Sequence, residues 1–175
     1  TKGTKLWLKK HQGGKHLFYN KFTTFSRSIA LATLAFAASL TAQAGELILL
    51  RGANGSGKTT LLRQLAGLSD PQAGKVIRTS DHHWIGHTNG LKAHETPRTH
   101  LQQWANVWGS DADVPGILQE MNLNRPADVP CRMLSAGQKR RTALARLKLE
   151  ERSVWLLDEP FNALDTDGQA HLAEM

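Results

Sequence analysis

A glycine-rich octapeptide, set between an apolar run and an amphipathic run, limits the folds open to this chain. It follows the pattern G-x-x-x-x-G-K-[ST] and consists of Gly52, Ala53, Asn54, Gly55, Ser56, Gly57, Lys58 and Thr59. The apolar residues 46–50 before it have the length of a buried parallel strand, and residues 60–66 after it form a helical pattern with leucines on one side. This order predicts an α/β fold, a P-loop NTPase core with a mainly parallel sheet.

The residue types of the octapeptide suit the phosphates of a nucleotide. Glycines let the main chain wrap tightly, so that backbone N–H groups converge on phosphate at the positive end of a helix. We expect Lys58 to reach the β and γ phosphates, Thr59 to ligate Mg²⁺ and Thr60 to complete the nucleotide-binding set. The loop alone is equally typical of kinases, GTPases, helicases and transport ATPases.

A second apolar run, residues 154–157, ends in two adjacent carboxylates. Placed after a core strand, Asp158 suits the Mg²⁺ shell, and Glu159 suits the general base that activates a hydrolytic water. A lone acidic pair after a strand is otherwise an ordinary acidic turn. The neighbouring motifs therefore decide between the two interpretations.

Four motifs in a fixed order resemble those of the ATP-binding-cassette (ABC) ATPases, from about Gly45 to Gly168. Besides the octapeptide they are LSAGQ at 134–138, LLDEP at 156–160 and NALD at 162–165. The resemblance implies ATP as substrate with Mg²⁺ as cofactor, a nucleotide-binding domain over 29–175, and an ABC-type inserted helical subdomain at about 88–149. It also implies a C-terminally incomplete domain, because the family's switch histidine lies one strand beyond residue 165.

The LSAGQ segment resembles the family's signature loop, with alanine at one of the two positions where the family usually carries glycine. Its residues are Leu134, Ser135, Ala136, Gly137 and Gln138. Ser135 is suited to cap a helix running from 136 to about 150, whose N–H groups form an anion site. The resemblance implies that this site binds nucleotide on the opposite protomer, and that Asp165 serves communication between protomers. The implied partners are a second cassette in a homodimer and integral membrane transporter subunits, with no nucleic acid expected.

His87 ends the strand-like run 84–87, at a position where ABC proteins usually carry glutamine. With LSAGQKRR and LDEPFNALD, it makes the chain resemble the ATPase of the cytochrome c maturation haem exporter. The resemblance implies haem export, a catalytic coupling role for His87, and a peripheral location on the cytoplasmic face of the inner membrane or the matrix face of the mitochondrial one. The alternatives are a soluble ABC ATPase acting on nucleic acid or ribosomes, and an ATP-clamped dimer without turnover.

The first 45 residues contain no acidic side chain. Residues 1–28 read as a basic extension of unknown order, either a disordered arm or an organellar transit segment. The uncharged run 29–44 imitates a secretory signal, but it is shorter than the roughly 20 residues of a spanning helix. We interpret it as a buried strand and turn.

Several further patterns are interpreted as structural. Thr96 and Pro97 are expected to open a helix with a core stripe of Leu101, Trp104, Ala105 and Trp108. Among the histidines near His87, surface positions are expected for His82, His83, His94 and His100. The basic residues of the signature helix are expected on a solvated face, and they are Lys139, Arg140, Arg141, Arg146 and Lys148.

Overall fold

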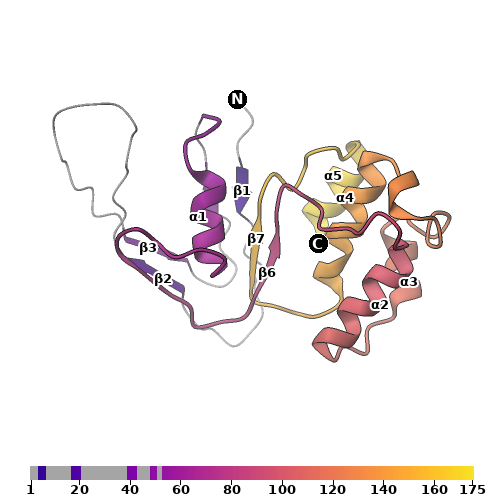
Figure 1. Ribbon diagram of the computed structural model, residues 1–175, viewed down its shortest axis with the longest axis horizontal. Helices are drawn as coiled ribbons and strands as arrows, with labels where there is room; N and C mark the ends of the chain where they lie inside the picture. Colours follow the sequence, from indigo (N-terminus) through magenta and orange to yellow (C-terminus); the bar gives the residue numbers. More distant parts are fainter. Residues whose placement is uncertain (1–3, 7–16, 21–38, 43–47, 51–52) are drawn as a thin grey trace. The chain divides into compact units, whose positions relative to one another are not determined.

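The chain divides into two structural units, each built from two segments of the sequence. The computed structural model describes residues 4–6, 17–20, 39–42, 48–50 and 53–175. The first unit contains Thr1–Trp84 and Arg152–Leu157, and the second contains Ile85–Glu151 and Asp158–Met175. Most of the strands belong to the first unit, and helices α2 to α5 belong to the second. Figure 1 labels these elements.

Antiparallel ladders join the strands that come before residue 80. Strand β1 (Thr4–Leu6) pairs with β4 (Ile48–Leu50), and β2 (Leu17–Asn20) pairs with both β3 (Ser39–Ala42) and β5 (Lys75–Ile77). The expectation of a parallel strand at 46–50 is wrong for its described part, because β4 pairs antiparallel with β1. An apolar run in the sequence predicts a buried strand, but it does not predict which strand pairs with it or in which direction.

The N-terminal segments take part in these ladders. The region set apart as a basic extension supplies β1 and β2, and its other residues lie outside the described part of the chain. The run 29–44 supplies β3 at Ser39–Ala42, as the predicted strand requires, and the rest of the run is likewise outside the described residues. No helix in the described residues is long and apolar enough to cross a membrane.

Strands β6 (His82–Ile85) and β7 (Val154–Leu157) pair in the parallel sense. Arg152, before β7, donates from Nη1 to the carbonyl of His82 at 2.9 Å, and the N–H of Asp158, after β7, donates to the carbonyl of Ile85 at 2.9 Å. The first residues of β6 and β7 therefore lie close together, as do their last residues, so the two strands run in the same direction. All four residues of β7 are buried, as predicted for a strand with both faces covered.

The core of the first unit forms between α1 (Lys58–Leu65) and β7. Leu62 and Leu65 of the helix are 0% and 2% exposed, and they cluster with Val154 and Leu156 from one face of the strand. The leucine pattern after the octapeptide is thus confirmed as a core-facing side. This packing fixes the start of α1, which is where the phosphate loop ends.

Helices dominate the second unit. They are α2 (Pro97–Trp108), α3 (Val114–Glu120), η1 (Cys131–Met133), α4 (Ala136–Ala145), η2 (Arg146–Lys148) and α5 (Thr166–Glu174). The predicted start of α2 is confirmed, because the Thr96 hydroxyl accepts from the N–H of Thr99 and Pro97 is the first helical residue. In its predicted stripe Leu101 and Ala105 are buried, while Trp104 and Trp108 are partly exposed.

Two expectations about polar residues are wrong. His83 and His100 are 2% and 3% exposed, so they are not surface residues. Arg140 of the signature helix is 2% exposed, so that helix does not present all its basic residues to solvent. The acceptors of Arg140 lie in distant parts of the sequence, and a local charge pattern contains no information about them. His100 instead lies beside the buried Glu95, five residues earlier.

Candidate nucleotide site

The described part of the octapeptide, residues 53–59, has the conformation that its glycines predict. Gly55 and Gly57 have φ angles of 79° and 88°, a left-handed region that side chains disfavour, although a Cβ at either position would meet nothing within 4 Å. Conformation, rather than space, therefore requires glycine at both positions. Gly52 lies outside the described residues.

Lys58 begins α1 and reaches back across the loop. Its Nζ donates to the carbonyl of Ala53 at 2.8 Å, and the same carbonyl accepts from the N–H of Ser56 at 3.2 Å. Residues 53–57 are exposed, and Lys58 and Thr59 are partly buried. The loop thus presents main-chain N–H groups, one ammonium group and one hydroxyl group at the start of a helix, where anions are stabilised.

The acidic pair after β7 separates into a buried and an exposed carboxylate. Asp158 is 1% exposed, whereas Glu159 is exposed and has a φ of 51°. A left-handed backbone is uncommon for a residue with a side chain, and it is found where neighbouring contacts hold it. Asn162 donates from Nδ2 to Oε2 of Glu159 at 3.4 Å.

His87 lies beside the first of these carboxylates. Its side chain is 59% exposed, and Nδ1 is 3.5 Å from Oδ2 of Asp158. The ring of His87 therefore contacts a carboxylate predicted to belong to the site. The contact agrees with the sequence-based choice of His87, and its role remains a prediction.

The signature residues begin α4 as predicted. The Ser135 hydroxyl accepts from the N–H of Gln138 at 3.2 Å, and the Gln138 Oε1 accepts from the N–H of Ser135 at 2.9 Å, which together make a capping box. The α-helix ends at Ala145 rather than near residue 150, because a 3₁₀ turn follows at Arg146–Lys148. Leu134 is buried and anchors the turn before the cap.

Helix α4 also contacts the NALD segment. A Cβ at Gly137 would lie 3.0 Å from the carbonyl oxygen of Ala163, so only glycine fits without displacing that residue. Arg141 Nη1 is 3.9 Å from Oδ2 of Asp165, whose Oδ1 accepts from the N–H of Gly168 and caps α5. The signature and NALD segments therefore lie side by side in the second unit.

Arg140, expected on a solvated face, is buried and contacts the backbone of the predicted site residues, a role that the sequence analysis missed. Its guanidinium donates five hydrogen bonds, to the carbonyls of Gly86, Asp158, Glu159 and Pro160 and to the side-chain oxygen of Asn89. Burial lowers the pKa of this guanidinium, and the negative charges of Asp158 and Glu159 oppose that change. The acceptors of Arg140 lie 18 to 54 residues away in the sequence, so no local pattern signalled these contacts.

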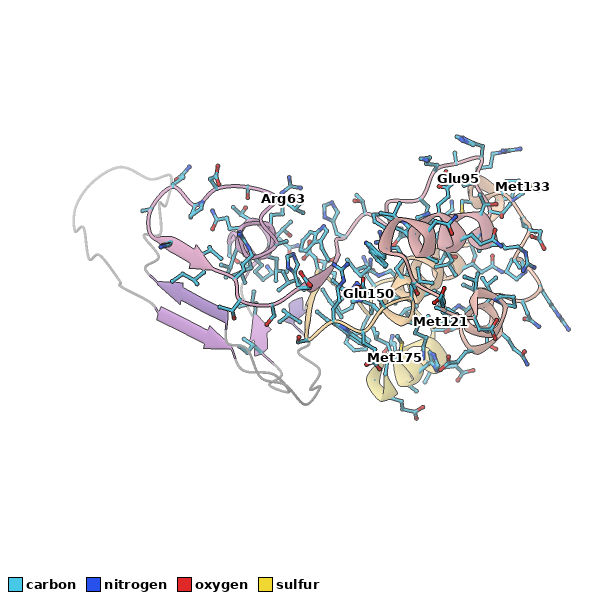
Figure 2. The ribbon with its side chains drawn as sticks, turned by 90° about the horizontal axis from the view of Figure 1, so that it is seen from below. Arg63, Glu95, Met121, Met133, Glu150 and Met175 are labelled. Atoms are coloured by element: carbon cyan, nitrogen blue, oxygen red, sulfur yellow. The ribbon has the colours of Figure 1, made fainter. Side chains whose placement is uncertain are left out.

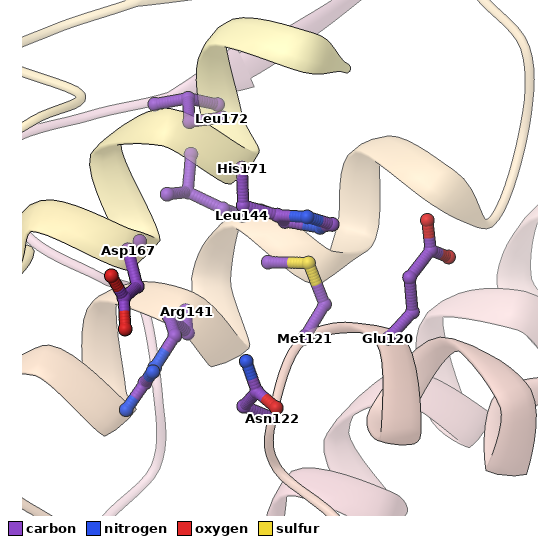
Figure 3. Close-up of a pocket in the computed structure, with 9 residues that line it drawn as sticks. Glu120, Met121, Asn122, Arg141, Leu144, Asp167, His171 and Leu172 are labelled. Atoms are coloured by element: carbon purple, nitrogen blue, oxygen red, sulfur yellow. The ribbon is translucent and has the colours of Figure 1, made fainter.

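A small pocket between α3, α4 and α5 holds His171, the one histidine after Glu159 (Figure 3). Arg141, Leu144 and Asp167 line the same pocket. The Nε2 of His171 is buried there, and no hydrogen-bond partner for it is found within the described residues. The ring of His171 thus faces this pocket within the helical unit.

The predicted site residues fall into two groups. The phosphate loop belongs to the first unit. The second unit brings together Asp158, Glu159, His87, the signature segment and Asp165, and Arg140 contacts the first two of these through their backbone.

Comparison with known proteins agrees with these features. Residues 36–162 match the family model described as ABC transporter. The chain is 60% identical over 136 residues to the cytochrome c biogenesis ATP-binding export protein CcmA of Hyphomonas neptunium, covering 78% of this chain and 70% of that protein. It is 44% identical over 146 residues to the protein of the same name from Salmonella typhi, covering 77% and 70%.

A solved structure supports the fold. An ABC transporter ATP-binding protein from Pyrococcus furiosus superposes with a TM-score of 0.66 at 18% identity, covering 91% of this chain and 83% of that one. This likeness confirms the P-loop NTPase fold predicted from the octapeptide. The family match spans most of the chain and includes the octapeptide, the signature segment and the acidic pair, so the chain belongs to the ABC transporter family of ATP-binding proteins.

Proposed function

We propose that this chain binds Mg-ATP and hydrolyses it to drive an export step in cytochrome c biogenesis, with haem as the exported group. The observation that carries the proposal is the loop at 53–59, where two left-handed glycines lead into a helix that begins at Lys58. The identity of 60% to a cytochrome c biogenesis export protein supports the choice of process.

Binding begins with the phosphates. The N–H groups of the loop and of the first turn of α1 bind phosphate oxygens, and Lys58 exchanges its bond to the Ala53 carbonyl for the β and γ phosphates. The Thr59 hydroxyl and the Asp158 carboxylate are the oxygen ligands that would hold Mg²⁺, which prefers such ligands and neutralises charge on the transferring phosphoryl group. The burial of Asp158 fits this use, because a buried carboxylate favours a cationic partner.

Hydrolysis requires a base that can reach the attacking water. Glu159 is exposed, and its left-handed backbone turns its side chain out of the strand direction at the point where β7 ends. We assign it to accept a proton from the attacking water. His87, beside Asp158, is assigned to couple the site to a partner subunit.

The proposed partners follow from the resemblance to the ABC ATPases. A second copy of the cassette completes each site through Ser135 and Gly137, and Asp165 serves contact between the copies. The membrane subunits dock on the second unit, in which Val107 of α2 is 74% exposed and Met133, labelled in Figure 2, is 69% exposed. Through these subunits the chain associates with the cytoplasmic face of the inner membrane, or with the matrix face in mitochondria.

Equilibrium dialysis with Mg-ATP tests the site. Lys58→Ala removes the charge that offsets the phosphates, and we expect ATP affinity to fall at least about 100-fold. Lys75→Ala, an exposed lysine of β5 in the same unit, is the matched control and leaves affinity unchanged. Equal affinity in the wild type and Lys58→Ala would exclude the proposed site.

A further inference from the structure

A buried arginine connects three segments of the second unit that are far apart in sequence. From Arg140 in α4, Nη2 donates to the carbonyls of Asp158 and Glu159 at 2.9 Å each, and Nε donates to the carbonyl of Pro160 at 3.3 Å. On the other side, Nη1 donates to the carbonyl of Gly86 at 2.8 Å and to Asn89 Oδ1 at 3.3 Å. A guanidinium has five N–H donors, so this number of bonds uses its full capacity.

The bonds to residues 158–160 dictate a particular backbone shape. Successive carbonyls of an extended strand point in opposite directions, so three in a row cannot reach one guanidinium. The chain bends at Glu159, where φ is 51°, and this bend turns the three carbonyls toward Arg140. The left-handed conformation of Glu159 is therefore what allows its carbonyl and the two neighbouring carbonyls to accept hydrogen bonds from Arg140.

The bonds on the other side fix the turn that carries His87. Gly86 and Asn89 flank that residue, and both accept from the same Nη1. His87 Nδ1 lies 3.5 Å from Asp158 Oδ2, so the two segments held by Arg140 meet at this pair. One side chain thus determines the backbone positions on both sides of the contact.

The backbone carbonyls that accept from Arg140 need donors, so an apolar side chain at position 140 would leave them unsatisfied. Arg140 supplies these donors from a rigid planar fork with a fixed charge. Lysine carries the charge but cannot reproduce the arrangement of the five donors. The close approach of Gly137 to Ala163 shows independently that α4 packs tightly on the same segment.

We propose that Arg140 is a positioning residue, which holds the backbone of Glu159 and the turn carrying His87 in register with the signature helix. The inference rests on the proposed function, because it assigns Glu159 and His87 their roles in ATP hydrolysis. Movement of α4 would then be transmitted directly to the carboxylate that activates water, through hydrogen bonds to its own peptide group.

Steady-state kinetics of two variants test the proposal. Arg140→Lys retains the charge but loses the fork, and Arg140→Met loses both. We expect kcat to fall about 10- to 100-fold in Arg140→Lys and further in Arg140→Met, with KM for ATP within about twofold of wild type, since misplacement of a catalytic group affects turnover more than binding. Arg125→Met, an exposed arginine in the same unit, is the control and retains wild-type kinetics. Wild-type kcat in Arg140→Lys would overturn the proposal.

Amide hydrogen exchange gives a readout that does not depend on activity. In Arg140→Lys we expect faster exchange in residues 86–90 and 158–164, and unchanged exchange in α2. Faster exchange spread evenly over the unit would show that Arg140 only stabilises the fold, and it would overturn the proposal. If the wild type hydrolyses no ATP, the proposed function fails, and the exchange pattern still decides whether Arg140 positions these two segments.

Discussion

At the scale of single residues, Glu159 combines an exposed carboxylate with a left-handed backbone. Replacing it by glutamine keeps the shape of the side chain and removes the base. We expect Glu159→Gln to bind ATP with wild-type affinity while kcat falls about 10²- to 10⁴-fold, the range for loss of a general base. Phosphate release and equilibrium dialysis measure the two quantities. Turnover within threefold of wild type would assign the base to another group.

His87 differs from Glu159 in its expected effect. Because its ring contacts Asp158 at 3.5 Å and is otherwise largely exposed, its loss should change coupling more than binding. We expect His87→Ala to lower the ATPase rate stimulated by the membrane subunits several-fold, with ATP affinity nearly unchanged. The stimulated ATPase rate is measured in the reconstituted complex, and ATP affinity is measured with the isolated chain. A parallel loss of affinity and stimulated rate would assign His87 to nucleotide binding.

At the scale of elements, α4 depends on its capping box. Ser135→Ala removes the acceptor for the N–H of Gln138, and we expect the free energy of unfolding to fall by about 1 kcal/mol, a typical value for a lost N-cap. Ser135→Thr keeps the acceptor and serves as the conservative control. Urea unfolding without nucleotide measures both. Equal stability of the alanine and threonine variants would show that the cap contributes little.

Sequence patterns predicted the elements whose determinants are local. Thr96, Pro97 and Thr99 lie within one turn, as do Ser135 and Gln138, so their spacing alone specifies a helix start. The acceptors of Arg140 lie 18 to 54 residues away, at Asp158 and Gly86, and no local pattern reports them. The antiparallel partner of β4 was missed for the same reason, because pairing depends on tertiary contacts.

At the scale of the whole molecule, a buried histidine makes stability depend on pH. Burial, together with the positive charge of Arg146, lowers the pKa of His100 to about 4, although the nearby Glu95 opposes the change. The unfolded chain therefore binds a proton below about pH 6.5 that the folded chain takes up only near pH 4. The contribution of His100 to stability is unaffected above pH 6.5, and we expect it to become unfavourable by about 3 kcal/mol as the pH drops to 4, with little further change below that pH.

Urea unfolding between pH 7 and 4 checks this expectation. His100→Gln retains a polar side chain without a titrating ring, so we expect its stability to fall less steeply over this range. His94→Gln, at an exposed position, is the matched control and keeps the wild-type slope. Identical slopes in all three proteins would mean that His100 is protonated as readily in the folded chain as in the unfolded one.

The parallel pair of β6 and β7 has a consequence for the order of folding. His82 and Arg152, which meet at the start of the pair, are 70 residues apart in sequence. Closing so long a loop costs chain entropy before any strand contact compensates for it. Helices α2 to α4 lie within this loop and form from local contacts, so their collapse shortens the path that must close. We expect the helical segment to form first and the parallel pair to follow, which makes the first unit depend kinetically on residues that are not part of it.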